Sequence, residues 1–375
     1  MWKNYLKIAL RDLLKQKGLS FINVLSLSIG LACFTLLLLF AVNEFNYDRF
    51  HTNNERIFRV YRWTEAMNDE GTEGDPYLPV PLGPAMKADL PDLETYTRFQ
   101  EAWGESFVRV NGTVSRLGVC FADPQFLNVF SFPMQYGNQA KALPGLNSIV
   151  LTEAIAIKLF GESNPIGRQL EIKLETEFEP FVVTAVAQNL PSNTSIQFEA
   201  LGNFEKVLAS ARMIERKNSW HHSAYHTFVK LREGSGLATD EKRLLQFRQK
   251  YYPGEEQELR DRGFWKGEGA PVTYRMQPLR AMHTQTLVGG GQVPPIEPRS
   301  IWILLAVAAA ILAIAGINFT TLSIGRSASR AREVGVRKVM GSGRGALVGQ
   351  FLVESVVLAA ISAVLGLGLM RLMLP

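Results

Sequence analysis

Three long apolar runs divide this chain. Residues 18–43 and 300–325 each form a stretch of 26 residues without a charge, and the apolar run within 345–375 is interrupted only by Glu354 and Arg371. An α-helix of about 20 residues is long enough to cross the ~30 Å hydrocarbon core of a bilayer. The pattern therefore predicts three transmembrane helices, one over each of these ranges.

The first run has to be compared with a cleaved signal peptide. A signal core has roughly 7–15 apolar residues and ends at small residues, whereas this run continues as far as Val42. Lipoprotein processing at Cys33 would leave a strongly apolar stretch behind. We therefore expect an uncleaved anchor, and with Cys33 inside a span we expect no disulfide bond to Cys120.

Residues 44–299 have the mixed pattern of a soluble domain. Short β-rich runs alternate with helical ones, and this order of elements predicts an α+β domain. The helix at 153–160 has Thr152 as its expected N-cap and Gly161 after its last turn, and a Gly/Pro-rich hinge at 289–298 leads back to the second apolar run. The expected strands are 57–63, 148–151, 169–174, 181–187 and 227–231, and the other expected helices are 84–90 and 244–251.

Basic residues are concentrated beside the apolar runs. The formal net charge is +5, but residues 1–17 and 326–344 hold the basic excess and the chain between them is net acidic. This distribution follows the positive-inside rule and differs from a nucleic-acid-binding face. It predicts a cytoplasmic N-terminus, an extracytoplasmic domain over 44–299 and a cytoplasmic loop over 326–344.

The N-terminal 17 residues are amphipathic. Trp2, Leu6 and Leu10 recur at helical spacing, and Lys3 and Lys7 lie on the other side. A helix of this kind can lie in the cytoplasmic interface of the membrane. The simpler alternative, a basic flank that only fixes topology, stays open beside it.

Residues that could carry out catalysis are sparse. The sequence has no Gly-x-x-x-x-Gly-Lys-Ser/Thr loop for ATP and no Gly-x-Ser-x-Gly elbow. His222 and His226, next to His221, could share a helix face and bind a metal, but they lack a firmly spaced third ligand, and the neighbouring Trp220 and Tyr225 favour packing. We therefore predict no catalytic, cofactor or metal site.

Two charged features lie close to the spans. Asp48, Arg49 and His51 follow the first span, where an interfacial ion-pair network is a more common arrangement than a catalytic triad. Glu354 lies near the start of the third span beside Gln350. A carboxylate in a span is a functional candidate by default, but this position favours an interfacial or helix-packing residue over a proton carrier.

The segment 327–343 is the most informative part of the chain. Its first part predicts a short helix, in which Glu333 and Arg337 form a favourable i,i+4 pair and which ends at Gly341. Gly335 costs such a helix about 1 kcal/mol relative to alanine, and a common reason for such a glycine is the close approach of another backbone. The alternative is a basic loop held by anionic lipid, which does not need the glycine.

At this segment the chain resembles the MacB/FtsX-like permease family of bacterial ABC transporters. The resemblance rests on Arg-Glu-Val-Gly-Val-Arg-Lys-Val-Met-Gly at 332–341 and continues into 315–322 and 350–355. It extends through the middle of the chain at 44–51, 121–126, 129–133, 150–153, 158–167 and 183–191.

The resemblance implies a fold, a mechanism and a set of partners. The fold is an α-helical membrane protein with three transmembrane helices and a large extracytoplasmic α+β domain, in the bacterial inner membrane. Two permeases, as a homodimer or a heterodimer, would pair in the lipid, and a separate ABC ATPase would dock on each cytoplasmic loop, with a periplasmic adaptor as a further partner. The coupling positions carried over by motif are Arg332, Glu333, Gly335, Val336, Arg337, Lys338 and Gly341.

Two functions follow from the family. The first is export driven by mechanotransmission, in which the ATPase moves the outer domain; the alternative is an FtsX-like regulatory subunit that controls an extracytoplasmic partner such as a cell-wall hydrolase. The family's basic unit has four spans, so we expect the FtsX-like unit at 300–375 to be incomplete.

Overall fold

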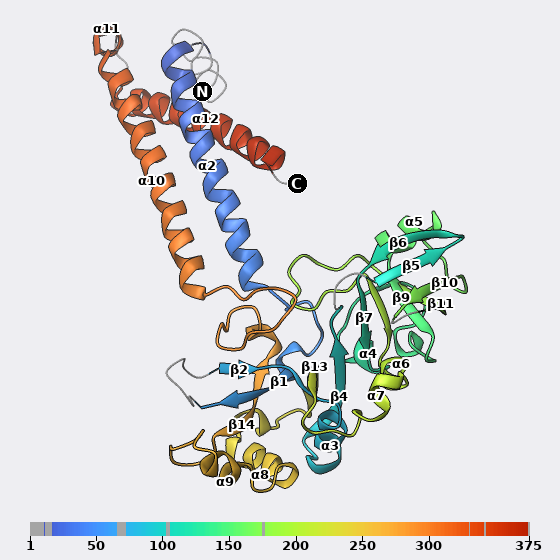
Figure 1. Cartoon of the computed structure of the whole chain (residues 1–375). Coiled ribbons are helices and arrows are strands. Elements are labelled where there is room, and N and C mark those ends of the chain that lie inside the picture. Colours follow the sequence, from blue (N-terminus) through green and yellow to red (C-terminus); the bar gives the residue numbers. More distant parts are fainter. Residues whose placement is uncertain are drawn as a thin grey trace. The chain divides into compact units, whose positions relative to one another are not determined.

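The computed structural model describes Arg11 and residues 17–65, 73–102, 106–174, 177–329, 331–340 and 343–373. The chain forms two compact units, one from residues 1–45 together with 298–375 and the other from residues 46–297 (Figure 1). The amphipathic helix expected at 1–17 lies outside the described residues except for Arg11 and Lys17.

Three long apolar helices form the first unit. They are α2 (Lys17–Phe45), α10 (Pro298–Ser329) and α12 (Arg344–Met373), and each is long and apolar enough to cross a membrane. The short helix α11 (Ala331–Val339) connects α10 to α12. The prediction of three transmembrane helices is confirmed: α2 and α10 extend a few residues beyond the uncharged runs that predict them, and α12 begins one residue before its predicted range and is described as far as Met373.

Helix α2 packs against both α10 and α12 (Figure 1). Glycines allow two of these contacts: a Cβ on Gly30 would lie 2.5 Å from the Cβ of Ala315, and one on Gly366 would lie 2.8 Å from the carbonyl oxygen of Ser28. Small residues of this kind let membrane helices approach closely. A polar contact adds to the packing, because the side-chain amide of Asn318 donates to Ser26 Oγ over 2.8 Å.

The second unit is built on one mixed β-sheet. Along the sheet the strands follow the order β14-β1-β13-β4-β7-β12-β9-β11-β10-β5-β6, while β2, β3 and β8 pair with β1, β13 and β11. The described strands are β1 (Ile57–Thr64), β2 (Glu73–Asp75), β3 (Leu78–Pro79), β4 (Leu93–Gln100), β5 (Ser106–Val110), β6 (Thr113–Leu117), β7 (Val119–Ala122), β8 (Met134–Tyr136), β9 (Ser148–Thr152), β10 (Gln169–Lys173), β11 (Phe178–Ala187), β12 (Ala200–Asn203), β13 (Ser223–Leu231) and β14 (Val272–Pro278).

Short helices cover this sheet. They are α3 (Leu82–Asp89), α4 (Phe126–Val129), α5 (Glu153–Phe160), α6 (Phe204–Leu208), α7 (Ala211–Ile214), α8 (Glu241–Tyr251) and α9 (Glu255–Asp261). The expected α+β class is confirmed. Gly161 ends α5 in the left-handed conformation, with φ of 72°. Thr152 stands at the N-cap position of α5, but its side chain makes no capping hydrogen bond.

Three apolar clusters form the core of this domain. One cluster lies under α3 and α8 and includes Leu82 and Leu244. A second contains Phe181 and other buried residues of strands β9 to β12. The third surrounds α4 and is rich in phenylalanine. Strand β9 is buried at every position, because it pairs with β11 on one side and β12 on the other and is covered by α5. A continuous apolar strand is what such a position requires.

Candidate coupling site

The sequence-predicted coupling residues lie on or beside α11. Arg332, Gly335, Val336 and Lys338 are exposed positions of this helix, and the structure brings them together between the two membrane helices α10 and α12. The backbones of Glu333 and Arg337 are helical, but their side chains, and Gly341 altogether, lie outside the described residues, so the expected ion pair stays a prediction.

The surface of α11 is open and partly apolar. Val336 is 60% exposed, Val339 is 88% exposed and Met340 is 82% exposed. A Cβ on Gly335 would meet no atom within 4 Å. No backbone of the described chain therefore explains this glycine, although we expected a close approach there. Exposed apolar side chains beside basic ones give this helix the chemistry of a contact surface.

Glu354 and Arg326 form a buried ion pair at the base of α11. Arg326 Nη1 lies 3.3 Å from Glu354 Oε1, and both side chains are only 5% exposed. Arg326 Nη2 also donates to Ser20 Oγ over 3.2 Å. Residues from α10, α12 and α2 thus meet at this point, which confirms the helix-packing interpretation of Glu354. Sequence reasoning did not identify Arg326 as its partner.

Two neighbouring residues hold the segment that enters the outer domain, Asp48 by hydrogen bonds and Tyr47 by ring stacking. The buried carboxylate of Asp48 accepts hydrogen bonds from the Ser195 amide over 2.9 Å and from Thr194 Oγ1 over 3.1 Å. Tyr47 stacks on His283 with 3.5 Å between ring centroids. Burial raises the pKa of Asp48, and the hydrogen bonds from Ser195 and Thr194 oppose that shift. The ion-pair network predicted for Asp48, Arg49 and His51 is wrong, because hydroxyl and amide groups bind Asp48 and Arg49 is exposed.

The predicted hinge at 289–298 is also held by side chains. Arg59 Nη1 donates to the carbonyl oxygen of Gly290 over 3.1 Å, and Gln292 Oε1 accepts a hydrogen bond from the Gln197 amide over 2.7 Å. The guanidinium of Arg59 is itself held by Gln277 Oε1 at 2.7 Å. This segment is therefore fixed to the domain at two points, which its glycines and prolines did not indicate.

His51 is buried among aromatic rings. Its ring lies 4.8 Å from Phe132 and 5.4 Å from Phe130, and burial lowers its pKa to about 3. The folded protein therefore keeps His51 neutral, whereas the unfolded chain takes up a proton below about pH 6.5. Stability from this residue is complete above that pH and is lost as the pH falls.

We expect His51→Phe to reduce the acid sensitivity of the domain. Between pH 7.5 and 5.5 the wild-type protein should lose about 1.4 kcal/mol of stability through His51, because the unfolded chain takes up a proton there that the folded chain does not. Thermal unfolding of the full chain in nanodiscs at pH 7.5 and 5.5 measures this. An equal fall in Tm for both proteins would contradict the assignment.

His222 and His226 do not share a helix face. His226 lies in β13, and its Nε2 is 3.1 Å from Glu101 Oε1. His222 precedes that strand, and Trp220 stacks on Tyr251 with a centroid distance of 4.2 Å. The helical spacing on which a metal site would depend is therefore wrong, and the packing interpretation of Trp220 is correct.

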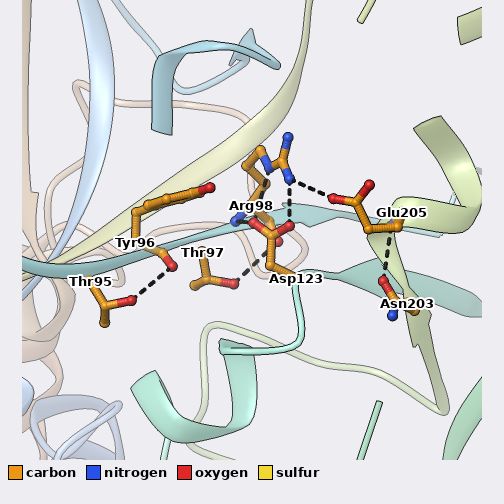
Figure 2. A network of polar contacts seen from close by, with 7 residues as sticks. All are labelled: Thr95, Tyr96, Thr97, Arg98, Asp123, Asn203 and Glu205. Atoms are coloured by element: carbon orange, nitrogen blue, oxygen red, sulfur yellow. Dashed lines mark hydrogen bonds and ion pairs between the residues drawn. The ribbon is translucent and has the colours of Figure 1, made fainter. Parts of the chain in front are cut away.

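A buried ion pair crosses the middle of the sheet. Figure 2 shows Arg98 of β4 facing Asp123, which follows β7, and Glu205 in the first turn of α6. Arg98 Nη2 lies 2.7 Å from Asp123 Oδ1 and Nε lies 3.0 Å from Asp123 Oδ2, and the side chains are 6% and 3% exposed. Burial alone would lower the pKa of Arg98, but the bonds and charge of Asp123 outweigh it and raise the pKa. Sequence analysis did not identify this pair.

The ion pair lies where the sheet is most weakly joined. Only Phe99 and Gln100 of β4 pair with β7, whereas β4 pairs with β13 along most of its length. Asn203 caps α6 by accepting a hydrogen bond from the Glu205 amide over 3.0 Å, which fixes Glu205 beside Arg98. Arg98 therefore ties the part of the sheet that contains β13 to the part that contains β12.

Comparisons with known proteins agree on a family for both units. Residues 20–247 match the MacB-like periplasmic core domain, and residues 305–375 match the FtsX-like permease C-terminal domain. A crystallised domain of a candidate permease protein from Porphyromonas gingivalis shares the fold, with a TM-score of 0.50 and 20% identity over 68% of this chain and 98% of that one.

Two curated proteins share shorter segments with the chain. The macrolide export ATP-binding/permease protein MacB of Nitrobacter winogradskyi is 43% identical over 72 residues, which are 19% of this chain and 11% of that protein. The uncharacterized ABC transporter permease YknZ of Bacillus subtilis is 37% identical over 67 residues, 18% of this chain and 17% of that protein. The matched segments thus cover under a fifth of each relative.

Proposed function

This chain belongs to the MacB/FtsX-like permease family, and on that premise we propose that it is the membrane subunit of an ABC-type exporter driven by a separate ATPase. The observation that carries the proposal is α11. This helix lies between two membrane helices and presents an exposed basic and apolar surface that the described chain does not cover. Basic side chains suit carboxylates on a partner, and Val336, Val339 and Met340 suit an apolar groove.

The proposed mechanism uses the chain without any catalysis of its own. An ATPase subunit would bind Arg332, Glu333, Gly335, Val336, Arg337, Lys338 and Gly341, and its closure on ATP would displace α11. The membrane helices would pass this displacement to the outer domain. We further propose that two copies of the permease pair in the inner membrane and that the outer domain acts on a periplasmic adaptor or on the exported substrate.

The first test is co-purification from native membranes. We expect an ABC ATPase to co-purify with the chain, and we expect the ATP turnover of that ATPase to rise when the chain is added in nanodiscs. The chain alone should hydrolyse no ATP, because the sequence has no phosphate-binding loop. A co-purified cell-wall hydrolase without an adaptor would support the FtsX-like regulatory function, and the absence of any ATPase would overturn both.

Membrane orientation provides a second prediction. In a Cys33→Ser, Cys120→Ser background, Leu287→Cys should react with an impermeant maleimide in intact spheroplasts and Met340→Cys should be protected until the membrane is opened. Leu287 is 64% exposed and Met340 is 82% exposed, so the protein itself blocks neither position. Labelling of Met340→Cys from outside would refute the proposed topology and, with it, the docking of an ATPase on α11.

A further inference from the structure

We propose that the buried Arg326–Glu354 pair, together with Ser20, is a positioning latch that makes α10, α12 and α2 respond as one body when α11 is displaced. This inference rests on the proposed function of α11. It assigns to Arg326 and Glu354 a role in transmitting motion, which goes beyond the docking of an ATPase.

The position of the pair in the chain supports this role. Arg326 stands in the last turn of α10, five residues before α11 begins, and Glu354 stands in α12, beyond the segment that follows α11. The ion pair therefore joins two residues that are 28 positions apart in the chain, with α11 between them. With the ion pair formed, a displacement of α11 moves α10 and α12 together. With the ion pair broken, each helix can tilt separately.

Ser20 brings the third helix into the latch. It lies in the first turn of α2 and is 8% exposed, and its hydroxyl accepts a hydrogen bond from Arg326. Helix α2 continues to Phe45, and the outer domain begins at Asn46. A displacement that reaches Arg326 therefore has a direct connection to the helix that leads into that domain.

The chemistry of the pair suits a latch between membrane helices. Ionisable side chains within apolar spans are costly and are kept inside a bundle with a partner. A guanidinium has several donors in a planar fork, so one Arg326 can hold Glu354 and Ser20 at the same time. An apolar residue in place of Arg326 or Glu354 would pack against its neighbour but would form no directional hydrogen bonds.

The test compares Glu354→Gln, which keeps the shape and removes the charge, with the exchange of Arg326→Glu and Glu354→Arg in one protein. Ser327→Ala is the matched control, because Ser327 is exposed and, among the described residues, its hydroxyl donates to the Ser323 carbonyl oxygen of its own helix. Three quantities are measured in nanodiscs at equal membrane abundance: ATPase binding, stimulated ATP turnover, and the spin-label distance between Leu19→Cys and Val339→Cys in a Cys33→Ser, Cys120→Ser background.

We expect Glu354→Gln to bind the ATPase as the wild type does, to lower stimulation by about fivefold or more, and to broaden the spin-label distance distribution. The exchange should partly restore the stimulation and the narrow distance distribution, and Ser327→Ala should change neither of these two quantities. Wild-type stimulation and an unchanged distribution in Glu354→Gln would overturn the latch. Glu354→Gln could fail to insert, and the exchange protein then decides. If the exchange protein inserts but shows neither the narrow distance distribution nor the ATPase stimulation of the wild type, the latch would also be overturned.

The spin-label measurement needs no ATPase. If Glu354→Gln broadens the distance distribution but the wild-type protein stimulates no ATPase, the role of the ion pair in holding the helices together would stand. The proposed function of α11 would then be refuted.

Discussion

Replacing Asp123 with alanine should lower the free energy of unfolding of the outer domain by about 3–5 kcal/mol, because a buried charge loses its partner. Arg98 is 6% exposed, and the carboxylate that would remain beside it in the described structure is that of Glu205, which lies 3.3 Å away and is half exposed. The loss should appear at the β4–β7 junction, where few backbone pairs remain to hold the sheet. Thermal unfolding and amide hydrogen exchange of the full chain in nanodiscs measure both effects.

A matched control is available within the same sheet. Arg109 and Glu171 also form an ion pair across strands, but their side chains are 36% and 41% exposed. Exposed pairs contribute at most about 1 kcal/mol, so Glu171→Ala should have a small effect. An Asp123→Ala protein as stable as Glu171→Ala would show that the buried pair does not hold the junction.

The main elements of the fold could be predicted because they depend on local patterns. Uncharged runs indicated α2, α10 and α12, and β-rich runs indicated β1, β9, β10, β11 and β13. Helix ends were less certain, since Thr152 occupies a cap position without making the capping bond. His226 was misplaced because two histidines four residues apart suggest a helix, whereas the alternation of β13 decides the structure.

The polar networks could not be predicted, because they join residues that are far apart in the chain. Asp123 lies 25 residues from Arg98 and Ser20 lies 306 residues from Arg326. No periodic pattern relates such pairs, and only tertiary packing brings them together. The coupling residues were predicted by motif alone, and the structure adds that α11 is exposed and that Gly335 faces open space.

Gly335→Leu should strongly weaken coupling while leaving the protein inserted and α11 helical. Leucine favours a helix over glycine by roughly 1 kcal/mol, and its side chain would meet nothing in the described chain. In a docked complex, however, it would occupy space at the closest approach of the ATPase. Overpacking of an interface costs about 1–3 kcal/mol, which corresponds to roughly five- to 150-fold weaker binding.

Gly335→Ala separates the effect of helix propensity from the effect of side-chain size. Alanine raises helix propensity by about 1 kcal/mol but adds only one methyl group, so the protein should bind the ATPase nearly as well as the wild type. A lipid-anchored basic loop predicts a different order, in which Gly335→Leu is harmless and loss of Arg332 and Lys338 weakens membrane association.

The most direct test of the account is the binding and stimulation of the co-purified ATPase by wild-type, Gly335→Ala and Gly335→Leu proteins at equal abundance in nanodiscs. The account predicts that wild type and Gly335→Ala bind and stimulate the ATPase, and that Gly335→Leu binds it about fivefold or more weakly and stimulates it correspondingly less. A Gly335→Leu protein that binds and stimulates the ATPase as well as the wild type would contradict the assignment of α11 as the coupling helix.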